Sequence, residues 1–411
     1  MGKKQEPYSS KTTARTGSTR GILALLWVGS KVVFWWKGIK VKLKNNVGKP
    51  QTPCIVLCNH GAFGDFAYAG TILRKWSPSF IVARLYFCHK WLGKLCRRLN
   101  CFPKSMFAID LESAKNCMRV LKHGGVLAMM PEARLSTVGK FEDIQEGTFS
   151  FLQKAGVPIY TIKIGGDYFS QPKWGDGMRR GSLIEAEMNL LFTAEEAKAL
   201  PLEELKRRTE DALRYDEWQW LEEHPKVAYR RRRLAEGLEN ILTRCPKCGK
   251  KYTIVTKGHD VMCEACGLRA TLDRRYGFVE ATPFANFAQW YEWQMEEYRK
   301  EIERDPNFAL TAEVELRHAS KDGKKMLRLA GNGTCTLDRA GLTYRGTRDG
   351  EPIEKHFSQK EIYRLLFGPG EDFEIYEGKE IWYFTPGERR SCIDWYMVSI
   401  LLKDMYERQE V

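Results

Sequence analysis

The sequence lacks any long uninterrupted hydrophobic run. A helix that crosses a bilayer needs about 20 predominantly apolar residues, whereas the longest such stretch here covers residues 22–36 and is broken by Lys31. The stretch contains aromatic side chains of the kind that settle at the level of lipid headgroups, namely Trp27, Phe34, Trp35 and Trp36. We therefore expect residues 20–40 to form a helix that lies in the membrane surface. An ordinary buried helix is the alternative.

Acidic residues are scarce at the start of the chain. The first fifty positions contain eleven Lys or Arg residues and a single acid, Glu6, so most of the formal net charge of +14 lies there. A basic segment beside an aromatic one is attracted to anionic lipid, by about 1 kcal/mol per basic residue near the surface. Residues 1–19 are rich in Ser, Thr, Lys and Gly and are predicted to be a disordered basic tail. The expected partner is an anionic phospholipid surface, and no nucleic acid is expected.

A disulfide framework is also missing, although the chain has twelve cysteines. Eight of them are scattered, several inside apolar runs, which favours a reducing compartment. The predicted location is therefore the cytoplasmic face of the membrane, with a peripheral or monotopic attachment. The other four cysteines form two Cys-x2-Cys pairs, and two such turns complete a tetrahedral thiolate site for a structural Zn²⁺ ion. The predicted ligands are Cys245, Cys248, Cys263 and Cys266.

The motif that carries most chemistry follows the apolar run of residues 54–57, which predicts a buried strand. It contains His60 and Asp65 in a His-x4-Asp pattern. An alcohol is a poor nucleophile at neutral pH, so acyl transfer to it needs a base. Imidazole titrates near that pH, and a carboxylate on its other nitrogen fixes the tautomer and stabilises the imidazolium. The pattern favours His60 as a general base oriented by Asp65. Taken alone, the pair is also compatible with an ordinary polar loop.

A second buried strand is predicted at residues 126–130, and it delivers Glu132 and Arg134 to a loop at the sheet edge. Ligands collect at such edges in α/β proteins, and arginine suits a phosphate because its planar fork donates two parallel hydrogen bonds. The helical pattern before this strand begins after Asp110, a typical N-cap, and ends before Gly124. A further strand is expected at residues 159–162, after a Gly and a Pro.

In their order and spacing these motifs resemble the PlsC-like 1-acylglycerol-3-phosphate acyltransferases. That family carries an Asn-His-x4-Asp block, a basic residue roughly forty positions later, a Pro-Glu-Gly-Thr-Arg-Ser block and a Val-Pro-Ile block. The resemblance covers roughly residues 20–215. The matching residues here are Asn59, His60, Asp65, Lys104, Pro131, Glu132, Ser136, Val157, Pro158 and Ile159.

The resemblance implies transfer of an acyl chain from acyl-CoA or acyl carrier protein to the sn-2 hydroxyl of 1-acylglycerol 3-phosphate (lysophosphatidic acid), which forms phosphatidic acid. It implies that His60 and Asp65 are the catalytic pair. The predicted substrate-binding residues are Asn59, Gly61, Lys104, Glu132, Arg134 and Ser136.

The chain departs from the family pattern at three positions. Ala62 replaces a serine, Lys104 replaces an arginine, and Arg134 stands one position before the family's arginine, where Leu135 is found. These departures leave alternatives open. The acceptor could be glycerol 3-phosphate, another lysophospholipid, or a different lipid or glycan. The domain could also be a non-catalytic module that binds the membrane surface.

The second half of the chain predicts further units. Residues 202–243 are helical in pattern, and an aromatic helix follows Pro283. From about residue 308 the apolar positions alternate, which predicts several strands. The turns expected between them are Asp322-Gly323, Asn332-Gly333 and Asp349-Gly350. A closing amphipathic helix is predicted over residues 392–408, and the arrangement resembles a pleckstrin-homology-like architecture.

The predicted fold class is α/β, with an acyltransferase sheet flanked by helices over residues 41–215. The tail of residues 1–19 and the interfacial helix of residues 20–40 precede it. A helical linker and the zinc ribbon are predicted over residues 216–275. An aromatic helix and a small β-rich domain with a C-terminal helix complete the chain over residues 276–411.

Overall fold

The computed structural model describes residues 20–280, 282–320 and 323–410. The chain divides into two compact units. The first comprises Met1–Lys173, Gly177–Arg230 and Asp322–Met326, and the second comprises Trp174–Asp176, Arg231–Lys321 and Leu327–Val411. The predicted tail of residues 1–19 lies outside the described residues.

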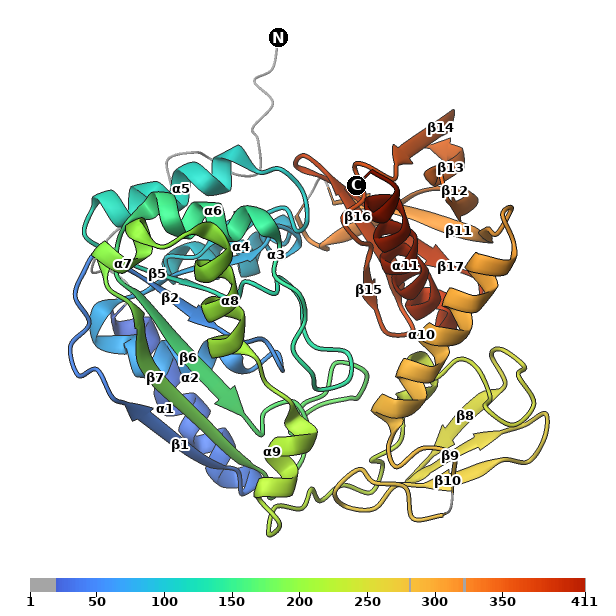
Figure 1. The fold of residues 1–411 in the computed structure, drawn as a ribbon, viewed down its shortest axis with the longest axis horizontal. Coiled ribbons are helices and arrows are strands. Elements are labelled where there is room, and N and C mark those ends of the chain that lie inside the picture. Colours follow the sequence, from blue (N-terminus) through green and yellow to red (C-terminus); the bar gives the residue numbers. More distant parts are fainter. Residues whose placement is uncertain (1–19, 281, 321–322, 411) are drawn as a thin grey trace. The chain divides into compact units, whose positions relative to one another are not determined.

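The first unit is built on a seven-stranded sheet with the order β1-β7-β6-β2-β5-β3-β4 (Figure 1). Neighbouring strands are parallel except for β6 and β7, so β1 and β7 run against the other strands. The strands are β1 (Lys40–Asn45), β2 (Cys54–Cys58), β3 (Ser79–Ala83), β4 (Phe102–Lys104), β5 (Val126–Met129), β6 (Ile159–Gly165) and β7 (Leu183–Phe192). The predicted α/β class and the three predicted strands of this domain are confirmed.

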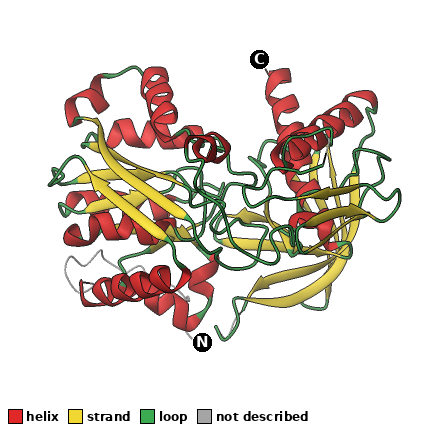
Figure 2. Cartoon of the chain, turned by 90° about the horizontal axis from the view of Figure 1, so that it is seen from below, coloured by secondary structure: helices red, strands yellow, loops and turns green. Residues whose placement is uncertain are grey.

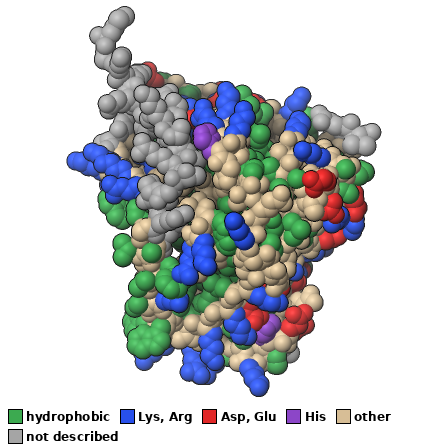
Figure 3. Space-filling model, turned by 90° about the vertical axis from the view of Figure 1, so that its left-hand side faces the viewer, with side chains coloured by type: hydrophobic (Ala, Val, Ile, Leu, Met, Phe, Trp, Pro, Cys, Tyr) green, Lys and Arg blue, Asp and Glu red, His purple; other side chains and the backbone are tan. Residues whose placement is uncertain are grey.

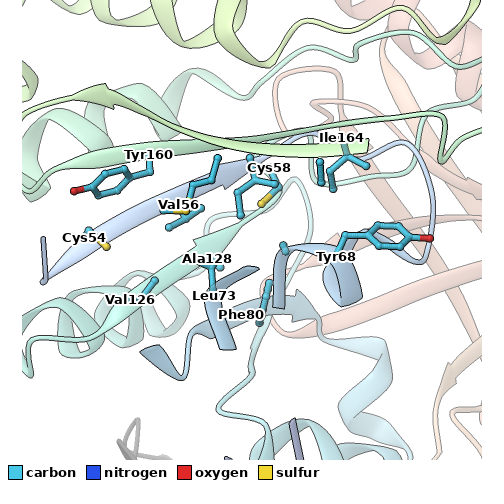
Figure 4. Packing of buried hydrophobic residues seen from close by; sticks show 14 of the residues in the cluster. Cys54, Val56, Cys58, Tyr68, Leu73, Phe80, Val126, Ala128, Tyr160 and Ile164 are labelled. Carbon is cyan, nitrogen blue, oxygen red and sulfur yellow. The ribbon is translucent and has the colours of Figure 1, made fainter. Parts of the chain in front are cut away.

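Strand β2 lies in the middle of the sheet and is buried along its whole length. Because successive side chains of a strand point to opposite faces, Cys54, Val56 and Cys58 join one hydrophobic cluster, whereas Ile55 and Leu57 join another. Figure 4 shows part of the first cluster, in which Val56 and Cys58 lie near residues of the neighbouring strands. A strand covered on both faces has a continuous apolar sequence, which explains why the sequence alone predicts this strand.

Helices cover both faces of this sheet (Figure 2). Tyr68 and Leu73 of α2 pack into the cluster on one face, and Val120 of α5, Phe149 of α6 and Leu205 of α8 pack into the cluster on the other. The helices of the unit are α1 (Arg20–Lys37), α2 (Asp65–Leu73), α3 (Leu85–Cys88), α4 (Lys90–Arg98), α5 (Leu111–Lys122), α6 (Glu146–Ala155), α7 (Ala194–Ala199), α8 (Leu202–Leu213) and α9 (Glu217–Glu223), with a 3-10 turn η1 (Arg74–Trp76) after α2.

The ends of two helices show how the sequence sets their lengths. Helix α5 begins after Asp110 as predicted, and the Asp110 side chain accepts a hydrogen bond from the Ser113 amide at 3.0 Å. Gly124 follows it with a φ of +72°. Helix α1 ends at Lys37, because Gly38 adopts a φ of +64° and the chain then enters β1. The helix predicted over residues 20–40 is therefore shorter than expected. Among the described residues, no helix has the length and apolarity needed to cross a membrane.

The second unit contains two antiparallel sheets. The three-stranded sheet has the order β10-β9-β8, and the seven-stranded sheet has the order β14-β13-β12-β11-β17-β16-β15. The strands are β8 (Ile254–Lys257), β9 (Asp260–Cys263), β10 (Arg269–Thr271), β11 (Leu310–Ala319), β12 (Leu327–Asp338), β13 (Gly341–Arg348), β14 (Glu351–Ser358), β15 (Leu366–Gly368), β16 (Asp372–Glu377) and β17 (Glu380–Pro386). The helices are α10 (Phe287–Arg304) and α11 (Cys392–Glu410), with 3-10 turns η2 (Leu238–Asn240) and η3 (Arg389–Ser391). The β-rich domain with a C-terminal helix is confirmed, and its pleckstrin-homology-like character stays a prediction.

Two details of the sequence-based prediction are wrong. Residues 224–243 do not continue a helix, because α9 ends before the His224-Pro225 step. The Asn332-Gly333 pair is not a turn but lies inside β12, where Gly333 pairs with Gly346 of β13. A Cβ atom on Gly333 would lie 2.3 Å from the Arg345 carbonyl oxygen, so glycine serves close strand packing there. The predicted Asp349-Gly350 turn is confirmed between β13 and β14.

Candidate active site

The candidate site lies where parallel strands of the first unit end. Strands β2, β5 and β6 are parallel, so their carboxyl ends meet at one edge of the sheet. His60 follows β2, Glu132 follows β5, and Asp167 follows β6. The sheet order places β2 between β5 and β6, so these three loops are neighbours.

His60 and Asp65 form the predicted pair. The Nδ1 atom of His60 lies 3.0 Å from Oδ2 of Asp65, which also accepts a hydrogen bond from the Ala62 amide at 3.1 Å. Asp65 is the first residue of α2 and is fully buried, whereas the His60 side chain keeps 22% of its surface exposed. Because Asp65 accepts from Nδ1–H, it selects the tautomer that leaves Nε2 as the proton acceptor. The short loop therefore supplies an oriented, accessible base.

Burial controls the protonation of this pair. Desolvation lowers the pKa of His60 to about 4, against the opposing charge of Asp167, and the positive charge of Lys173 lowers it further. The imidazole is therefore neutral at physiological pH and able to take a proton. Burial raises the pKa of Asp65 to about 7, while hydrogen bonds from Asp167 and from the Ala62 amide act in the opposite direction.

Glu132 connects the loop after β5 to the loop that carries His60. Its Oε1 accepts a hydrogen bond from the His60 amide at 2.8 Å, and its Oε2 accepts one from the Glu142 amide at 2.9 Å. The hydroxyl of Tyr215 donates to the same Oε2 at 3.4 Å. Glu132 is fully buried, and burial raises its pKa to about 8. The carboxyl group therefore fixes the backbone of His60 relative to β5.

Two further predicted residues also hold backbone in place. Asn59 is fully buried, and its amide group exchanges hydrogen bonds of 2.7 and 2.8 Å with the backbone of Ile164 in β6. The Ser136 hydroxyl donates to the Lys140 carbonyl at 2.7 Å and accepts from the amides of Gly139 and Lys140. The Ser136 amide donates to the His60 carbonyl at 3.0 Å. Both side chains thus shape the loops that flank His60, and direct substrate binding by them stays a prediction.

The two predicted phosphate-binding cations occupy different surroundings. Arg134 is buried, with 6% of its surface exposed, and its guanidinium forms an ion pair with Glu142. Lys104 ends β4, which lies three strands away from β2 in the sheet order. Burial lowers the pKa of Lys104, and the nearby Asp110 partly offsets this effect. The structure therefore brings Arg134 near the catalytic loop but engages it with an acid, and it leaves Lys104 on the far edge strand.

Ala133 marks a strained position between Glu132 and Arg134. Its φ of +59° lies in the left-handed region, where a residue with a Cβ atom is disfavoured by roughly 1–2 kcal/mol. The resembled family has glycine at this place in its Pro-Glu-Gly-Thr-Arg-Ser block. Ala133 therefore adopts the turn that brings Glu132 to His60 at an energetic cost.

Two acidic residues at the site were not predicted from the sequence. Asp167 has 1% of its surface exposed and lies against Gly61, where an added Cβ atom would be 2.7 Å from Oδ2 of Asp167. Glu217 of α9 is fully buried and accepts hydrogen bonds from the Gly166 amide at 2.9 and 3.0 Å. A partial signal for Asp167 existed, because it follows Gly165-Gly166 a few residues after the strand predicted at residues 159–162. Nothing in the sequence pattern placed Glu217 near it.

The four cysteines of the second unit form a candidate metal centre. Their Sγ atoms all lie within 4.8 Å of one another, with 3.6 Å between Cys245 and Cys266 and 3.8 Å between Cys248 and Cys263. A tetrahedral Zn²⁺ with bonds near 2.3 Å requires sulfur separations of about 3.8 Å. Each knuckle closes with an amide-to-carbonyl hydrogen bond of 2.9 Å, donated by Gly249 and Gly267, both at positive φ. The donor set fits a structural zinc ion.

Comparison with known proteins shows that the first unit is similar to acyltransferases. Residues 38–165 match the family model described as Acyltransferase. The chain is 22% identical over 162 residues to the chloroplastic 1-acyl-sn-glycerol-3-phosphate acyltransferase BAT2 of Brassica napus, covering 38% of this chain and 45% of that protein. It is 21% identical over 124 residues to the 1-acyl-sn-glycerol-3-phosphate acyltransferase of Bacillus subtilis, covering 30% of this chain and 60% of that protein.

The crystal structure of the 1-acyl-sn-glycerophosphate acyltransferase PlsC from Thermotoga maritima matches with 23% identity and a TM-score of 0.35, over 47% of this chain and 81% of that one. The chain spans less than two thirds of the length of the curated relatives named above. The family match supports the predicted enzyme class, an acyltransferase, and it ends before the four cysteines and the β-rich domain.

Metal analysis tests the candidate zinc centre. We expect one zinc per purified chain, because four thiolates converge on one tetrahedral site. Replacing Cys263 by Ser should lower the zinc content to near zero and lower the melting temperature, since metal binding stabilises the fold. Replacing Cys392, a buried cysteine outside the cluster, by Ser should leave the zinc content unchanged. The assignment would be contradicted if full-length protein without zinc had the same melting temperature as protein with zinc.

Proposed function

We propose that this protein transfers an acyl group from a thioester, carried by coenzyme A or acyl carrier protein, to the sn-2 hydroxyl of 1-acylglycerol 3-phosphate. The observation that carries the proposal is the buried Asp65 carboxylate at 3.0 Å from Nδ1 of a partly exposed His60. The family match over residues 38–165 supports acyl transfer as the reaction class. Three relatives bear the name of an acyltransferase for this acceptor, which supports the choice of substrate.

In the proposed reaction, Nε2 of His60 removes the proton of the acceptor hydroxyl as its oxygen attacks the thioester carbonyl. The tetrahedral intermediate then expels the thiolate, which receives the proton from the imidazolium. An ester bond forms and a thioester bond breaks, so the products are the acylated lipid and the free thiol. Asp65 stabilises the positive charge on His60 throughout, and general base catalysis of this kind contributes roughly 10²–10⁴ in rate. No covalent acyl-enzyme is required.

Charge on the substrate needs positive partners at the same sheet edge. Backbone amides of the Gly61 loop are proposed to stabilise the oxyanion that develops on the carbonyl. The phosphate headgroup is proposed to be positioned by Lys104 and Arg134. Glu132 is proposed to contribute indirectly, because it fixes the loop that carries Arg134. Arg134 would have to divide its guanidinium donors between Glu142 and the phosphate, because the ion pair occupies part of its fork. The acceptor assignment depends on that sharing.

Helix α1 is proposed to hold the first unit on an anionic membrane surface, on the cytoplasmic face. Trp35 and Trp36 are 81% and 62% exposed. Further large apolar side chains of the helix are exposed as well, namely Leu25, Leu26, Val28, Val32 and Val33. Cations lie over its indole rings, with Lys31 4.0 Å from the Trp27 ring and Arg180 5.5 Å from the Trp36 ring. A face of mixed aromatic and basic side chains suits the headgroup region. Figure 3 shows one face of the molecule on which hydrophobic side chains lie among Lys and Arg side chains.

Replacement of His60 by Ala tests the catalytic base. We expect the rate of acyl transfer to lipid to fall at least 10²-fold, because no other group would remove the hydroxyl proton. The release of thiol from acyl-CoA in the presence of vesicles and lysophosphatidic acid measures the reaction. His123, an exposed histidine after α5, provides the matched control, and its replacement by Ala should leave the rate unchanged. A His60→Ala protein with a rate within about twofold of the parent would sink the assignment.

An acceptor panel tests the substrate. We expect thiol release to require an acceptor and kcat/KM to be highest for 1-acylglycerol 3-phosphate, because the proposed cations recognise its phosphate. Glycerol 3-phosphate and lysophosphatidylcholine are the comparison acceptors. A higher kcat/KM for one of these would replace the proposed acceptor while leaving the chemistry intact. Absence of thiol release with every acceptor would instead favour a non-catalytic membrane-binding module.

Paired replacement of Trp35 and Trp36 by Ala tests the membrane surface. We expect at least tenfold weaker binding to phosphatidylglycerol vesicles, because two exposed indoles lose their burial in the headgroup region. Co-sedimentation measures the affinity, and added salt should weaken the binding of the parent. Leu329→Ala, at a side chain of β12 that is 53% exposed, is the control for loss of exposed apolar surface. Unchanged sedimentation of the double variant would exclude α1 as the membrane contact.

A further inference from the structure

Asp167 is a buried acid beside the loop that carries His60. It follows Gly165 and Gly166 at the end of β6, and Gly166 has a φ of +78° that makes the tight turn possible. The turn carries the Asp167 carboxyl group against the backbone of Gly61, the residue after His60. Only 1% of the Asp167 surface is exposed, so solvent does not supply its hydrogen bonds. The position is therefore a buried one that supports the catalytic loop.

Buried carboxyl oxygens without donors gather at this point. Oδ1 of Asp65 and both side-chain oxygens of Asp167 are buried. Among the described residues, they accept no hydrogen bond from an amide, a hydroxyl or a cationic side chain. The carboxyl groups of Asp65 and Glu217 both lie within hydrogen-bonding reach of the Asp167 carboxyl group. Two carboxyl groups hydrogen-bond to each other only when one of them carries a proton. A single proton on Asp167 would satisfy an oxygen of each residue at once.

We propose that Asp167 is a positioning residue that works as a protonated carboxylic acid: it donates a hydrogen bond to the buried oxygen of Asp65 and so holds Asp65 ionised and aligned with His60. This assignment rests on the proposed base function of His60. Asp167 makes no bond with substrate in this arrangement. Its contribution is to complete the acceptor set of Asp65, which already receives hydrogen bonds from His60 and from the Ala62 amide through its other oxygen.

The surrounding charges explain which carboxyl group keeps the proton. Groups that influence Asp167 or Asp65 electrostatically are His60, Tyr68, Glu132, Tyr215 and Glu217, and Lys173 acts on His60. Burial and the negative charge of Asp65 raise the pKa of Asp167 well above its ordinary value. Asp65 has the two additional donors, so the negative charge is more favourable there. The proton therefore belongs on Asp167.

Activity measurements on two substitutions separate the protonated acid from an ionised one. Asp167→Asn keeps a donor of nearly the same shape, so we expect the acyl transfer rate at pH 7.5 (about neutral, where His60 is a free base) to stay within roughly threefold of the parent. Asp167→Ala removes the donor, and we expect at least a tenfold loss. Because that hydrogen bond lowers the pKa of Asp65, the acid limb of the pH–rate profile should move to higher pH in Asp167→Ala and stay in place in Asp167→Asn.

Thermal unfolding gives a readout that does not depend on catalysis. An acid whose folded pKa is raised destabilises the fold increasingly as pH rises from its unfolded pKa, near 4, toward its folded pKa. Asn does not titrate, so the melting temperature of Asp167→Asn minus that of the parent should grow from pH 5 to pH 8. Asp211→Asn, at an exposed acid of α8, is the control and should show no such growth.

The outcomes distinguish this proposal from the proposed function. If Asp167→Asn loses as much activity as Asp167→Ala, or if the melting-temperature difference is flat with pH, Asp167 is ionised and the proposal fails. If Asp167→Ala keeps the parent's rate and pH profile, the hydrogen bond does not position Asp65. Should His60→Ala leave activity intact, the base function fails, while the pH dependence of the melting temperature still decides the protonation of Asp167. If Asp167→Ala does not fold, the Asn substitution and its melting curves carry the test.

Discussion

The contact between Nδ1 of His60 and Oδ2 of Asp65 is the interaction on which the proposed chemistry of the first unit depends. A carboxylate without solvent is unfavourable unless donors surround it, and the fold supplies these donors from the catalytic loop itself and from the neighbouring loops. The seven-stranded sheet makes this possible because β2 lies between β5 and β6, so three loops converge on one residue pair. The hydrogen bonds that orient His60 therefore also offset the free energy of burying the Asp65 carboxylate.

The loops around the pair are fixed mainly by side-chain contacts to backbone. Asn59 links the end of β2 to β6, Glu132 links it to the loop after β5, and Ser136 closes the turn that follows. Several residues that motif resemblance marks as functional thus act on the position of His60. Burial raises the pKa of Glu132, which favours its protonated form. The number of protons that the buried acids hold therefore affects the hydrogen bonds of the site.

The sequence predicted the parts of the fold whose signals are local. The apolar run of β2, the Asp110 cap of α5 and the spacing of the four cysteines each depend on neighbours in the chain. It failed where a distant partner decides the outcome. Asn332-Gly333 has the composition of a turn, yet close approach of β13 keeps it in a strand.

Acidic residues of the candidate site follow the same division. Asp65 was found through its spacing from His60, but Glu217 reaches the site from α9, far along the chain. Asp and Glu are mostly exposed in proteins. A periodic pattern of apolar residues therefore does not identify the acids that are buried. The position of Arg134 in the loop after β5 follows from the local sequence, whereas its ion pair with Glu142 depends on the fold of the loop.

Gly38 and Ile39 alone separate α1 from β1, and β1 pairs directly with β7 along its whole length. A connection this short restricts the movement of the helix relative to the sheet. If α1 lies among headgroups as proposed, the sheet-edge loops are held at a fixed distance from the bilayer surface. The position of α1 would then set the depth at which the candidate site meets the glycerol backbone of a lipid.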